Sequence, residues 1–452
     1  MFVNELLQSF RLNNGIFTSY NDKIYSYNDL FELIFSAINI CETNYIREGS
    51  IVALIGDFTP NSISMLLALL YKKCTVIPLD KNDDISKKLV IAQCEFIIDS
   101  TYFHKYDISI TKNKPDNSLY VILKERSSSG LVIFTSGTSG NPKGALHDFN
   151  NIASSYKITK NTSQQDLILN FLLFDHWGGL NTLFRSLCAS SKVVYLGERT
   201  PAKVCEVIQR ESVTVLPTTP TFLNLLIVSG EYKRWNLSSL RLITYGAEPI
   251  GESTLQKISE IFPTIRLKQT YGLIELGVVP TKSLSNNSLL VKLGGDNFQY
   301  RIIDDILQIK SPTTILGYLN ALAPITEDGW FITGDKVKVC GEYLHILGRE
   351  SELINIGGEK FYPIEVEDVI MNYSSDIKDA LVYPEKNSLF GSILSAKITV
   401  LNNFEKEQYP RLKEGITNHC KSNLSKHKIP IKFYFSKDEL HGLRFKKNRS
   451  NT

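Results

Sequence analysis

Residues 131–144 read LVIFTSGTSGNPKG, an apolar run that leads directly into a loop of glycines and hydroxyl side chains. Backbone N–H groups at glycines, hydroxyl groups and one lysine can together surround a polyphosphate. The loop is not a Walker A motif, because Lys143 is followed by Gly144 rather than by Ser or Thr. A flexible Ser/Gly linker would not account for the strand in front or for the closing Pro-Lys-Gly. The pattern predicts phosphate binding by Thr135, Ser136, Gly137, Thr138, Ser139, Gly140 and Lys143.

Outward from this loop, short apolar or β-branched runs alternate with helix-like segments. The strand-like runs are 51–55, 75–79, 95–98, 193–196, 213–216 and 240–244, and the helix-like segments are 62–71, 85–93, 202–210, 221–228 and 253–262. This alternation predicts α/β layers with substantially parallel sheets over most of residues 1–290. Ligands of such sheets bind at the carboxyl ends of the strands.

After Gly294 the pattern changes to pairs of strands joined by tight turns. Strands expected at 300–303 and 306–310 flank Asp304-Asp305, and strands expected at 336–340 and 343–347 flank Gly341-Glu342. This part is expected to form a β-rich third subdomain.

Past Arg349 the sequence predicts a compact α+β module. Its expected elements are a helix from Pro363, a strand near Leu381, a strand at 394–400, a helix at 409–423 and a strand at 431–435. The fold class is therefore α/β. We expect a large N-terminal domain of two α/β layers and a β-rich subdomain, residues 1–349, and a small mobile C-terminal domain, residues 350–452.

Composition excludes several classes of protein. The 452 residues are 43% hydrophobic and 21% charged, with 50 basic against 47 acidic side chains, so no global field favours nucleic acid or an anionic membrane. The apolar stretch 63–79 is interrupted by Lys72 and Lys73, and 1–14 lacks a continuous apolar run, so neither a membrane span nor a signal peptide is expected. The seven cysteines have no metal-ligand spacing and indicate reduced thiols in the cytoplasm.

The loop at 135–144 closely resembles the phosphate loop of the adenylate-forming superfamily, which includes acyl-CoA synthetases, luciferases and the adenylation domains of peptide synthetases. Four further motifs of that family follow in its order along nearly the whole chain, and five in order, counting the loop, make the resemblance specific. The four are Tyr245-Gly246-Ala247-Glu248-Pro249 on the adenine side, Tyr271-Gly272-Leu273-Ile274-Glu275, the ribose motif Thr333-Gly334-Asp335, and the hinge Gly348-Arg349 with the segment 354–367.

The resemblance assigns roles that suit the chemistry of these side chains. The carboxylate of Asp335 can accept hydrogen bonds from a ribose diol, and Arg349 supplies donors to the sugar or phosphate. Glu275 offers a hard oxygen to Mg²⁺, which with Lys143 would offset phosphate charge as ATP reacts. Ile274 stands where the family has Thr, so one hydrogen bond to a phosphate, about 1.5 to 3 kcal/mol, is lost.

The segment Phe174-Asp175-His176-Trp177-Gly178-Gly179 resembles the stretch where acyl-CoA synthetases place a His between the carboxylate site and the acyl pocket. His176 is the candidate for that position, with a structural His in a packed turn as the alternative. Phe174-Asp175 also resembles the Phe-Asp pair by which amino-acid-activating domains hold the α-amino group. An amino-acid substrate therefore stays open.

Two C-terminal segments complete the resemblance. Gly357-Gly358 resembles the segment that faces the thiol acceptor, where paired glycines let a pantetheine arm approach the backbone. The family's catalytic lysine lies in a Gly-Lys-x-x-Arg setting. Here Lys446 and Arg449 keep that spacing, Phe445 stands in place of Gly, and Lys447 is a rival. A solvated basic tail is the alternative interpretation.

The sequence thus predicts an acid–thiol ligase. A small-molecule carboxylic acid and ATP, with Mg²⁺, would give an acyl-adenylate and pyrophosphate. CoA, or the phosphopantetheine of an acyl or peptidyl carrier protein, would then take the acyl group as a thioester. The rival hypotheses are a stand-alone amino-acid adenylation enzyme that loads a carrier protein, and a non-catalytic nucleotide-binding homologue. The sequence leaves the acid, the acceptor and the oligomeric state open.

Overall fold

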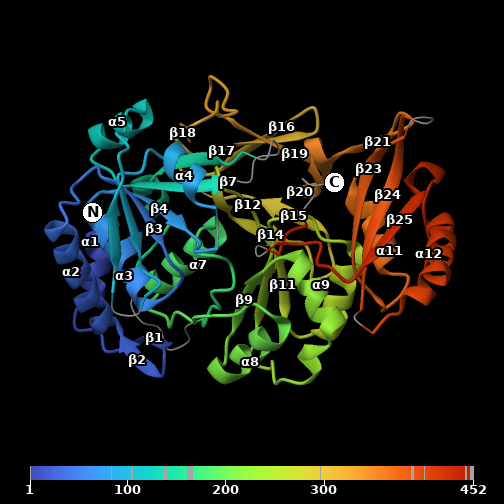
Figure 1. Ribbon diagram of the computed structural model, residues 1–452, viewed down its shortest axis with the longest axis horizontal. Coiled ribbons are helices and arrows are strands. Elements are labelled where there is room, and N and C mark those ends of the chain that lie inside the picture. The colour runs from blue at the N-terminus through green and yellow to red at the C-terminus, as the bar shows by residue number, and fades with distance from the viewer. Residues whose placement is uncertain are drawn as a thin grey trace.

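The computed structural model describes residues 2–82, 84–102, 105–135, 141–159, 166–295, 297–387, 391–401, 403–442 and 445–447. The chain forms two α/β layers, a β-rich subdomain and a C-terminal α+β module, which confirms the predicted fold class (Figure 1). None of the described helices is both long enough and apolar enough to cross a bilayer.

The first layer is a seven-stranded sheet in the order β18-β8-β7-β4-β3-β5-β6. Its strands are β3 (Ile51–Ile55), β4 (Thr75–Leu79), β5 (Phe96–Asp99), β6 (Asp107–Ile110), β7 (Gly130–Thr135), β8 (Lys143–Asp148) and β18 (Gly317–Tyr318). The four central strands are parallel, and β6, β8 and β18 are antiparallel additions at the edges. The alternation read from the sequence therefore holds for the centre of the sheet.

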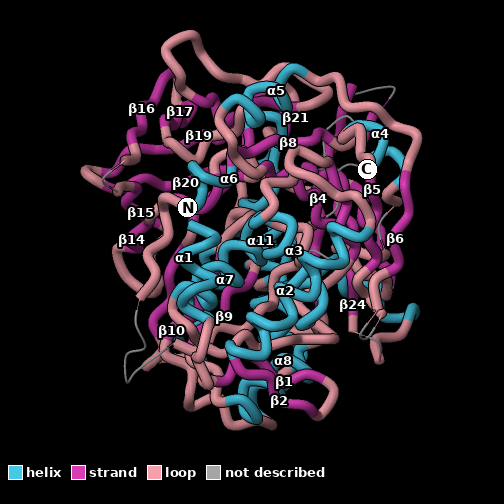
Figure 2. Tube along the Cα trace, turned by 90° about the vertical axis from the view of Figure 1, so that its left-hand side faces the viewer, coloured by secondary structure: helices cyan, strands magenta, loops and turns pink. Residues whose placement is uncertain are grey.

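Helices cover both faces of this sheet. They are α1 (Phe2–Phe10), α2 (Tyr27–Thr43), α3 (Pro60–Tyr71), α4 (Ser86–Ile91), α5 (Ser118–Glu125), α6 (Phe149–Ala153) and α7 (Trp177–Cys188), with the hairpin β1 (Ile16–Tyr20) and β2 (Lys23–Ser26) beside them. Figure 2 shows α1, α2 and α3 together on one side of the molecule. Helix α3 starts at the N-cap Thr59 and is mostly apolar, and all its residues from Pro60 to Leu70 are buried.

The second layer is a three-stranded parallel sheet in the order β11-β10-β9. Its elements are α8 (Pro201–Glu211), β9 (Val215–Thr218), α9 (Pro220–Ser229), β10 (Leu242–Tyr245), α10 (Glu252–Ile261) and β11 (Arg266–Gln269). Each αβ unit buries its apolar face in one hydrophobic core. The strand predicted at 193–196 is wrong: Val194 makes only an isolated bridge to Leu169.

The β-rich subdomain contains a six-stranded antiparallel sheet in the order β14-β15-β20-β19-β17-β16. Its strands are β14 (Thr281–Ser283), β15 (Leu290–Leu293), β16 (Gln299–Ile303), β17 (Ile306–Lys310), β19 (Phe331–Cys340) and β20 (Tyr343–Arg349), and the hairpin β12 (Tyr271–Leu273) and β13 (Gly277–Val279) precedes them. Asp304 and Asp305 turn with φ of 51° and 64°, which a two-residue hairpin requires. The β-rich subdomain begins before Gly294, earlier than predicted. The sequence did not reveal this, because β14 and β15 are too short to give a recognisable strand pattern.

The C-terminal module encloses a hydrophobic core of its own, drawn from residues 354–420. It consists of β21 (Ile354–Ile356), β22 (Glu359–Phe361), α11 (Pro363–Met371), β23 (Ile377–Asn387), β24 (Gly391–Val400), α12 (Tyr409–Asn423) and β25 (Lys432–Ser436). The helices and strands expected here are confirmed. Figure 1 shows this module in orange and red beside α9.

Candidate active site

The candidate site lies where three parallel strands end. Thr219, Gly246 and Tyr271 follow closely on β9, β10 and β11, and parallel strands present their carboxyl ends at one edge of a sheet. Gly246 is required at this edge: a Cβ there would lie 2.4 Å from Thr270 Oγ1 and 2.6 Å from the Thr270 carbonyl oxygen. The adenine-side segment predicted from the sequence is therefore a tight turn at the end of β10.

Glu248 fastens this turn to helix α9. The backbone N–H and the hydroxyl of Thr221 both donate to Glu248 Oε1, at 2.9 and 2.5 Å. Burial raises the pKa of Glu248, while the Thr221 hydrogen bonds and then the charges of Lys447 and Lys446 oppose that rise. Ala247, which lies between Gly246 and Glu248, has a φ of 74° in the left-handed region. The hydrogen bonds from Thr221 to Glu248 hold Ala247 in that conformation.

Asp335, the predicted ribose ligand, is 6% exposed and is fixed from two sides. The Tyr271 hydroxyl donates to Asp335 Oδ2 at 2.6 Å, and Arg349 Nε lies 3.2 Å from Asp335 Oδ1. Asp335 and Arg349 are register partners across β19 and β20. Burial raises the pKa of Asp335, and the charge of Arg349 opposes this. Each carboxylate oxygen can accept a second hydrogen bond, so Asp335 retains capacity for two sugar hydroxyls.

Glu275, the predicted metal ligand, lies in the same cluster. The Tyr318 hydroxyl donates to Glu275 Oε1 at 2.5 Å, and Lys143 Nζ lies 5.3 Å from the centre of the Tyr318 ring. No group of three His, Cys, Asp or Glu residues in the described part of the chain could enclose a metal ion. A single carboxylate nevertheless suits Mg²⁺, which keeps water and phosphate oxygens as its other ligands.

The phosphate loop itself is described only at its two ends. Thr135 and Lys143 are register partners in the β7–β8 hairpin, so they stand side by side at the edge where β7 ends. The predicted residues Ser136, Gly137, Thr138, Ser139 and Gly140 lie outside the described residues, as does Arg449.

The hairpin that contains Gly272 and Ile274 is stabilised by packing. The hydroxyl of the Thr that the family has in place of Ile274 is absent here. A Cβ on Gly272 would lie 2.6 Å from the Gly277 carbonyl oxygen, so the hairpin closes only with glycine. The Ile274 side chain packs against two hydrophobic cores, and its carbonyl oxygen lies 2.8 Å from His147 Nε2. Burial lowers the pKa of His147 to about 4. The ring is therefore neutral at pH 7.

One pocket brings together two of the predicted catalytic residues. His176 and Lys446 both line it, and so does Ala247 of the adenine-side segment. His176 is the N-cap of α7, where its Nδ1 accepts a hydrogen bond from the Gly178 N–H at 3.2 Å. The other residues of the pocket are Phe171, Leu172, Leu173, Thr219 and Phe445.

Asp175, the neighbour of His176, faces a cation from the protein itself. Lys88 Nζ of α4 lies 4.0 Å from Asp175 Oδ2, and the two residues are only 8% and 4% exposed. A buried carboxylate needs such a partner, because an unpaired buried charge is costly. This pairing weighs against Asp175 as the partner of a substrate ammonium.

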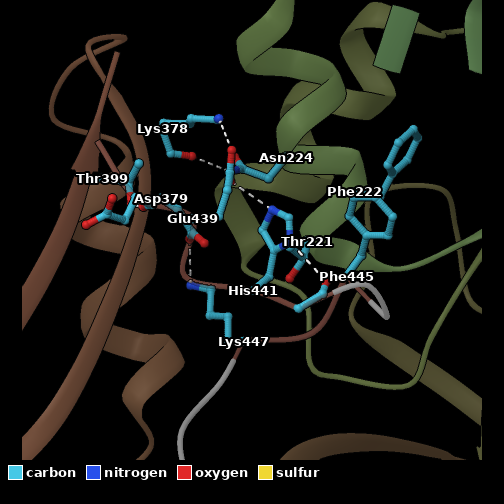
Figure 3. Close-up of polar contacts among 12 residues, drawn as sticks. Thr221, Phe222, Asn224, Lys378, Asp379, Thr399, Glu439, His441, Phe445 and Lys447 are labelled. Carbon is cyan, nitrogen blue, oxygen red and sulfur yellow. Dashed lines mark hydrogen bonds and ion pairs between the residues drawn. The ribbon is translucent and has the colours of Figure 1, made fainter. Parts of the chain in front are cut away.

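The two adjacent lysines of the tail take different positions. Lys446 lines the pocket with His176, whereas Lys447 Nζ lies 2.9 Å from Glu367 Oε2 and 3.2 Å from Asp379 Oδ1 and donates to the Ala380 carbonyl oxygen at 2.6 Å. Figure 3 shows Lys447 directed toward the C-terminal strands. Lys447 is therefore tied into the C-terminal module.

Gly357 and Gly358 form the turn between β21 and β22 and do not line this pocket. Their φ values are 64° and 91°, and a Cβ on either would meet no atom within 4 Å. Both are exposed. In this arrangement of the chain, the predicted acceptor segment lies away from Lys446 and His176.

Sequence reasoning missed three residues of the site: Thr219, Thr221 and Tyr318. The two threonines belong to the run Thr218-Thr219-Pro220-Thr221, in which Thr219 caps helix α9. That run between a predicted strand and a predicted helix was the available signal. Tyr318 has none, because only tertiary folding brings β18 beside β8 and Glu275.

A family model described as AMP-binding enzyme matches residues 62–306 of the chain. A 2-succinylbenzoate–CoA ligase of Listeria innocua is 27% identical over 417 residues, which cover 85% of this chain and 84% of that protein. An indoleacetate–CoA ligase of Aromatoleum aromaticum is 28% identical over 295 residues, which cover 60% of this chain and 57% of that protein.

The fold is also shared with solved structures. An o-succinylbenzoate CoA synthetase of Bacillus subtilis, in complex with its acyl-adenylate intermediate, matches with a TM-score of 0.78 at 22% identity. The match covers 99% of this chain and 97% of that one.

Proposed function

Because the chain belongs to the AMP-binding enzyme family, we propose that it activates a carboxylic acid with ATP as an acyl-adenylate and transfers the acyl group to the thiol of CoA. The observation that carries the proposal is the convergence of His176, Lys446 and Ala247 on one pocket, from which the charge of Lys446 also acts against the burial that raises the pKa of Asp335. A nucleotide site and a mobile cation beside a second pocket are what this reaction requires.

The nucleotide would be held by residues that are already fixed in place. Asp335 would accept hydrogen bonds from the ribose hydroxyls, and because Tyr271 and Arg349 immobilise its carboxylate, little reorganisation accompanies binding. Glu275 would hold Mg²⁺, which supplies positive charge to the phosphates. Lys143, at the end of the phosphate loop, adds a further positive charge on the same side.

Lys446 would act on the first chemical step. The acid carboxylate attacks the α-phosphorus, the bond to pyrophosphate breaks, and negative charge concentrates between the two groups. A positioned ammonium stabilises that charge only while it is present, so a lysine carried by a mobile C-terminal module can serve the first step and then leave. His176 would separate the carboxylate site from the acyl pocket.

We propose a domain boundary near residue 350, with the C-terminal module as the mobile part. Its separate hydrophobic core supports this boundary, since a unit with its own core can move as one body. The exposed Gly357-Gly358 turn would reach the site after such a movement, and CoA would then be the acceptor. The seven free cysteines accord with a cytoplasmic enzyme.

For the acid we propose a carboxylate that carries an aromatic group. The two relatives are named for 2-succinylbenzoate and indoleacetate, which both contain an aromatic ring. The Lys88–Asp175 pair disfavours an amino acid. The buried carboxylates of Asp335 and Glu275 disfavour a non-catalytic role, because buried charges are costly to keep without use.

Pyrophosphate release across aryl, fatty, hydroxy and amino acids, with Mg²⁺ and without CoA, tests the proposal. We expect release with at least one aryl acid and at least a tenfold loss in Asp335→Ala. Release that does not depend on any acid, or that survives unchanged in Asp335→Ala, would contradict the proposed function.

A further inference from the structure

We propose that Phe445 is a positioning residue that holds Lys446 in the adenylation pocket by seating its ring among aromatic residues of the N-terminal domain. The inference rests on the proposed function, and it concerns the residue that replaces the family's glycine before the catalytic lysine. It assigns a purpose to the departure from the family that is seen at this position.

The ring of Phe445 packs against three aromatic side chains, those of Phe171, Phe222 and His441, which together form its seat. Its centroid lies 5.3 Å from that of Phe171 and 5.4 Å from that of Phe222, the second contact being edge-to-face at 83°. His441 stacks on it at 5.2 Å. Phe171 and Phe222 are fully buried in the core of the second layer, so the seat is rigid. Such aromatic pairs stabilise beyond the area that they bury.

The backbone of Phe445 adopts a conformation that disfavours a bulky side chain, so the ring contacts have to offset this strain. Its φ is 49°, in the left-handed region where glycine is favoured and a bulky side chain is disfavoured. The Phe445 N–H donates to the Gly442 carbonyl oxygen at 2.9 Å. Phe445→Gly would relieve the backbone strain but lose the ring contacts. If the ring contacts contributed nothing, this substitution would only stabilise the protein.

Lys446 consequently stands between two anchors that belong to different parts of the fold. On one side, the Thr219 hydroxyl donates to the Phe445 carbonyl oxygen at 2.9 Å, in addition to the ring contacts with Phe222. On the other side, Lys447 is bound to Glu367 and Asp379. With both neighbours fixed, the backbone of Lys446 is held beside the pocket that its side chain lines.

A hydrogen bond between the two parts of the fold keeps the anchors aligned. Asn224 Nδ2 of α9 donates to the Lys378 carbonyl oxygen of β23 at 2.9 Å (Figure 3). Phe222 of the Phe445 seat and Asn224 of this contact both lie on α9, so both hold the C-terminal module in the arrangement that presents Lys446. Movement of the module for thioester formation would require Phe445 to leave its seat.

The test compares Phe445→Gly with Phe445→Tyr, which keeps the ring, in the two half-reactions. We expect Phe445→Gly to lower kcat for acid-dependent pyrophosphate release at least tenfold with the KM for ATP within twofold of native. Consumption of supplied acyl-adenylate by CoA should stay within twofold of native. Phe445→Tyr should retain native rates in both steps. A Phe445→Gly enzyme that is as fast as native, or that loses both steps equally, would overturn the proposal.

Hydrogen exchange gives a readout that does not depend on activity. We expect Phe445→Gly, and not Phe445→Tyr, to speed amide exchange at residues 445–447 and at the start of α9. Unchanged exchange in Phe445→Gly would overturn the inference even if the native enzyme showed no activity with any acid. Absence of activity together with the expected exchange pattern would count against the proposed function and leave the seat intact.

Discussion

Removing Lys447 should destabilise the C-terminal module without removing the chemistry of the site. Its ammonium lies 2.9 Å from Glu367 and 3.2 Å from Asp379, and these two side chains are only 1% and 5% exposed. Lys447→Ala would leave two buried carboxylates without this cation. Breaking a buried ion pair by removal of one partner costs about 3 to 5 kcal/mol. With Lys446 as the catalytic lysine, we expect Lys447→Ala to be mild for the reaction and costly for stability.

Hydrogen exchange in β23 and β24 measures this loss where it should occur. A loss of about 3 kcal/mol corresponds to roughly 100-fold faster exchange of amides that open with the module. The matched control is Lys446→Ala, which should leave exchange in β23 and β24 unchanged while slowing adenylate formation by orders of magnitude. If Lys447→Ala leaves exchange unchanged and instead abolishes adenylate formation, the roles of the two lysines are reversed and the reasoning is refuted.

Three further outcomes follow from the geometry. Glu275→Ala should slow adenylate formation at least tenfold, equivalent to about 1.4 kcal/mol of barrier, and raise the Mg²⁺ requirement, whereas native rates at low Mg²⁺ would exclude Glu275 as metal ligand. Gly358→Trp should preserve adenylate formation and lose thioester formation, with Gly358→Ala as the control for strain at φ 91°; equal loss of both steps would indicate misfolding. Burial lowers the pKa of His147 to about 4. As the pH falls below 6.5, the His147 ring therefore becomes protonated in the unfolded chain while it stays neutral in the folded protein. The free energy of unfolding should then drop by about 2 kcal/mol between pH 7.5 and 5, measured by urea denaturation, and this part of the slope should vanish in His147→Gln.

The sequence predicted best where a local pattern is sufficient. The strand at 51–55, the strand at 306–310 and the helix at 409–423 each carry a complete periodicity and turn signals, and the structure has them at those positions. The segment 193–196 is equally apolar, yet it forms only one bridge. Its failure shows that an apolar run becomes a strand only if a neighbouring strand offers it a complete edge.

The candidate site was predictable to the extent that its residues occur in continuous motifs. Asp335, Glu275 and Lys143 were named from such motifs, and the fold brings Glu275 and Lys143 together through Tyr318. Tyr318 could not be found, because its partners are 43 and more residues away in sequence. Nor could the seat of Phe445, since its contacts with Phe171 and Phe222 form only when the C-terminal tail returns to the second layer.

The fate of isotopically labelled oxygen tests acyl-adenylate formation most directly. An aryl acid with ¹⁸O in both carboxylate positions, incubated with ATP, Mg²⁺ and CoA, should yield AMP that carries one ¹⁸O atom, because the oxygen that attacks the α-phosphorus stays on AMP when the thiol takes the acyl group. Mass spectrometry of the AMP measures this. Formation of ADP, or of AMP without the label alongside the thioester, would contradict the account.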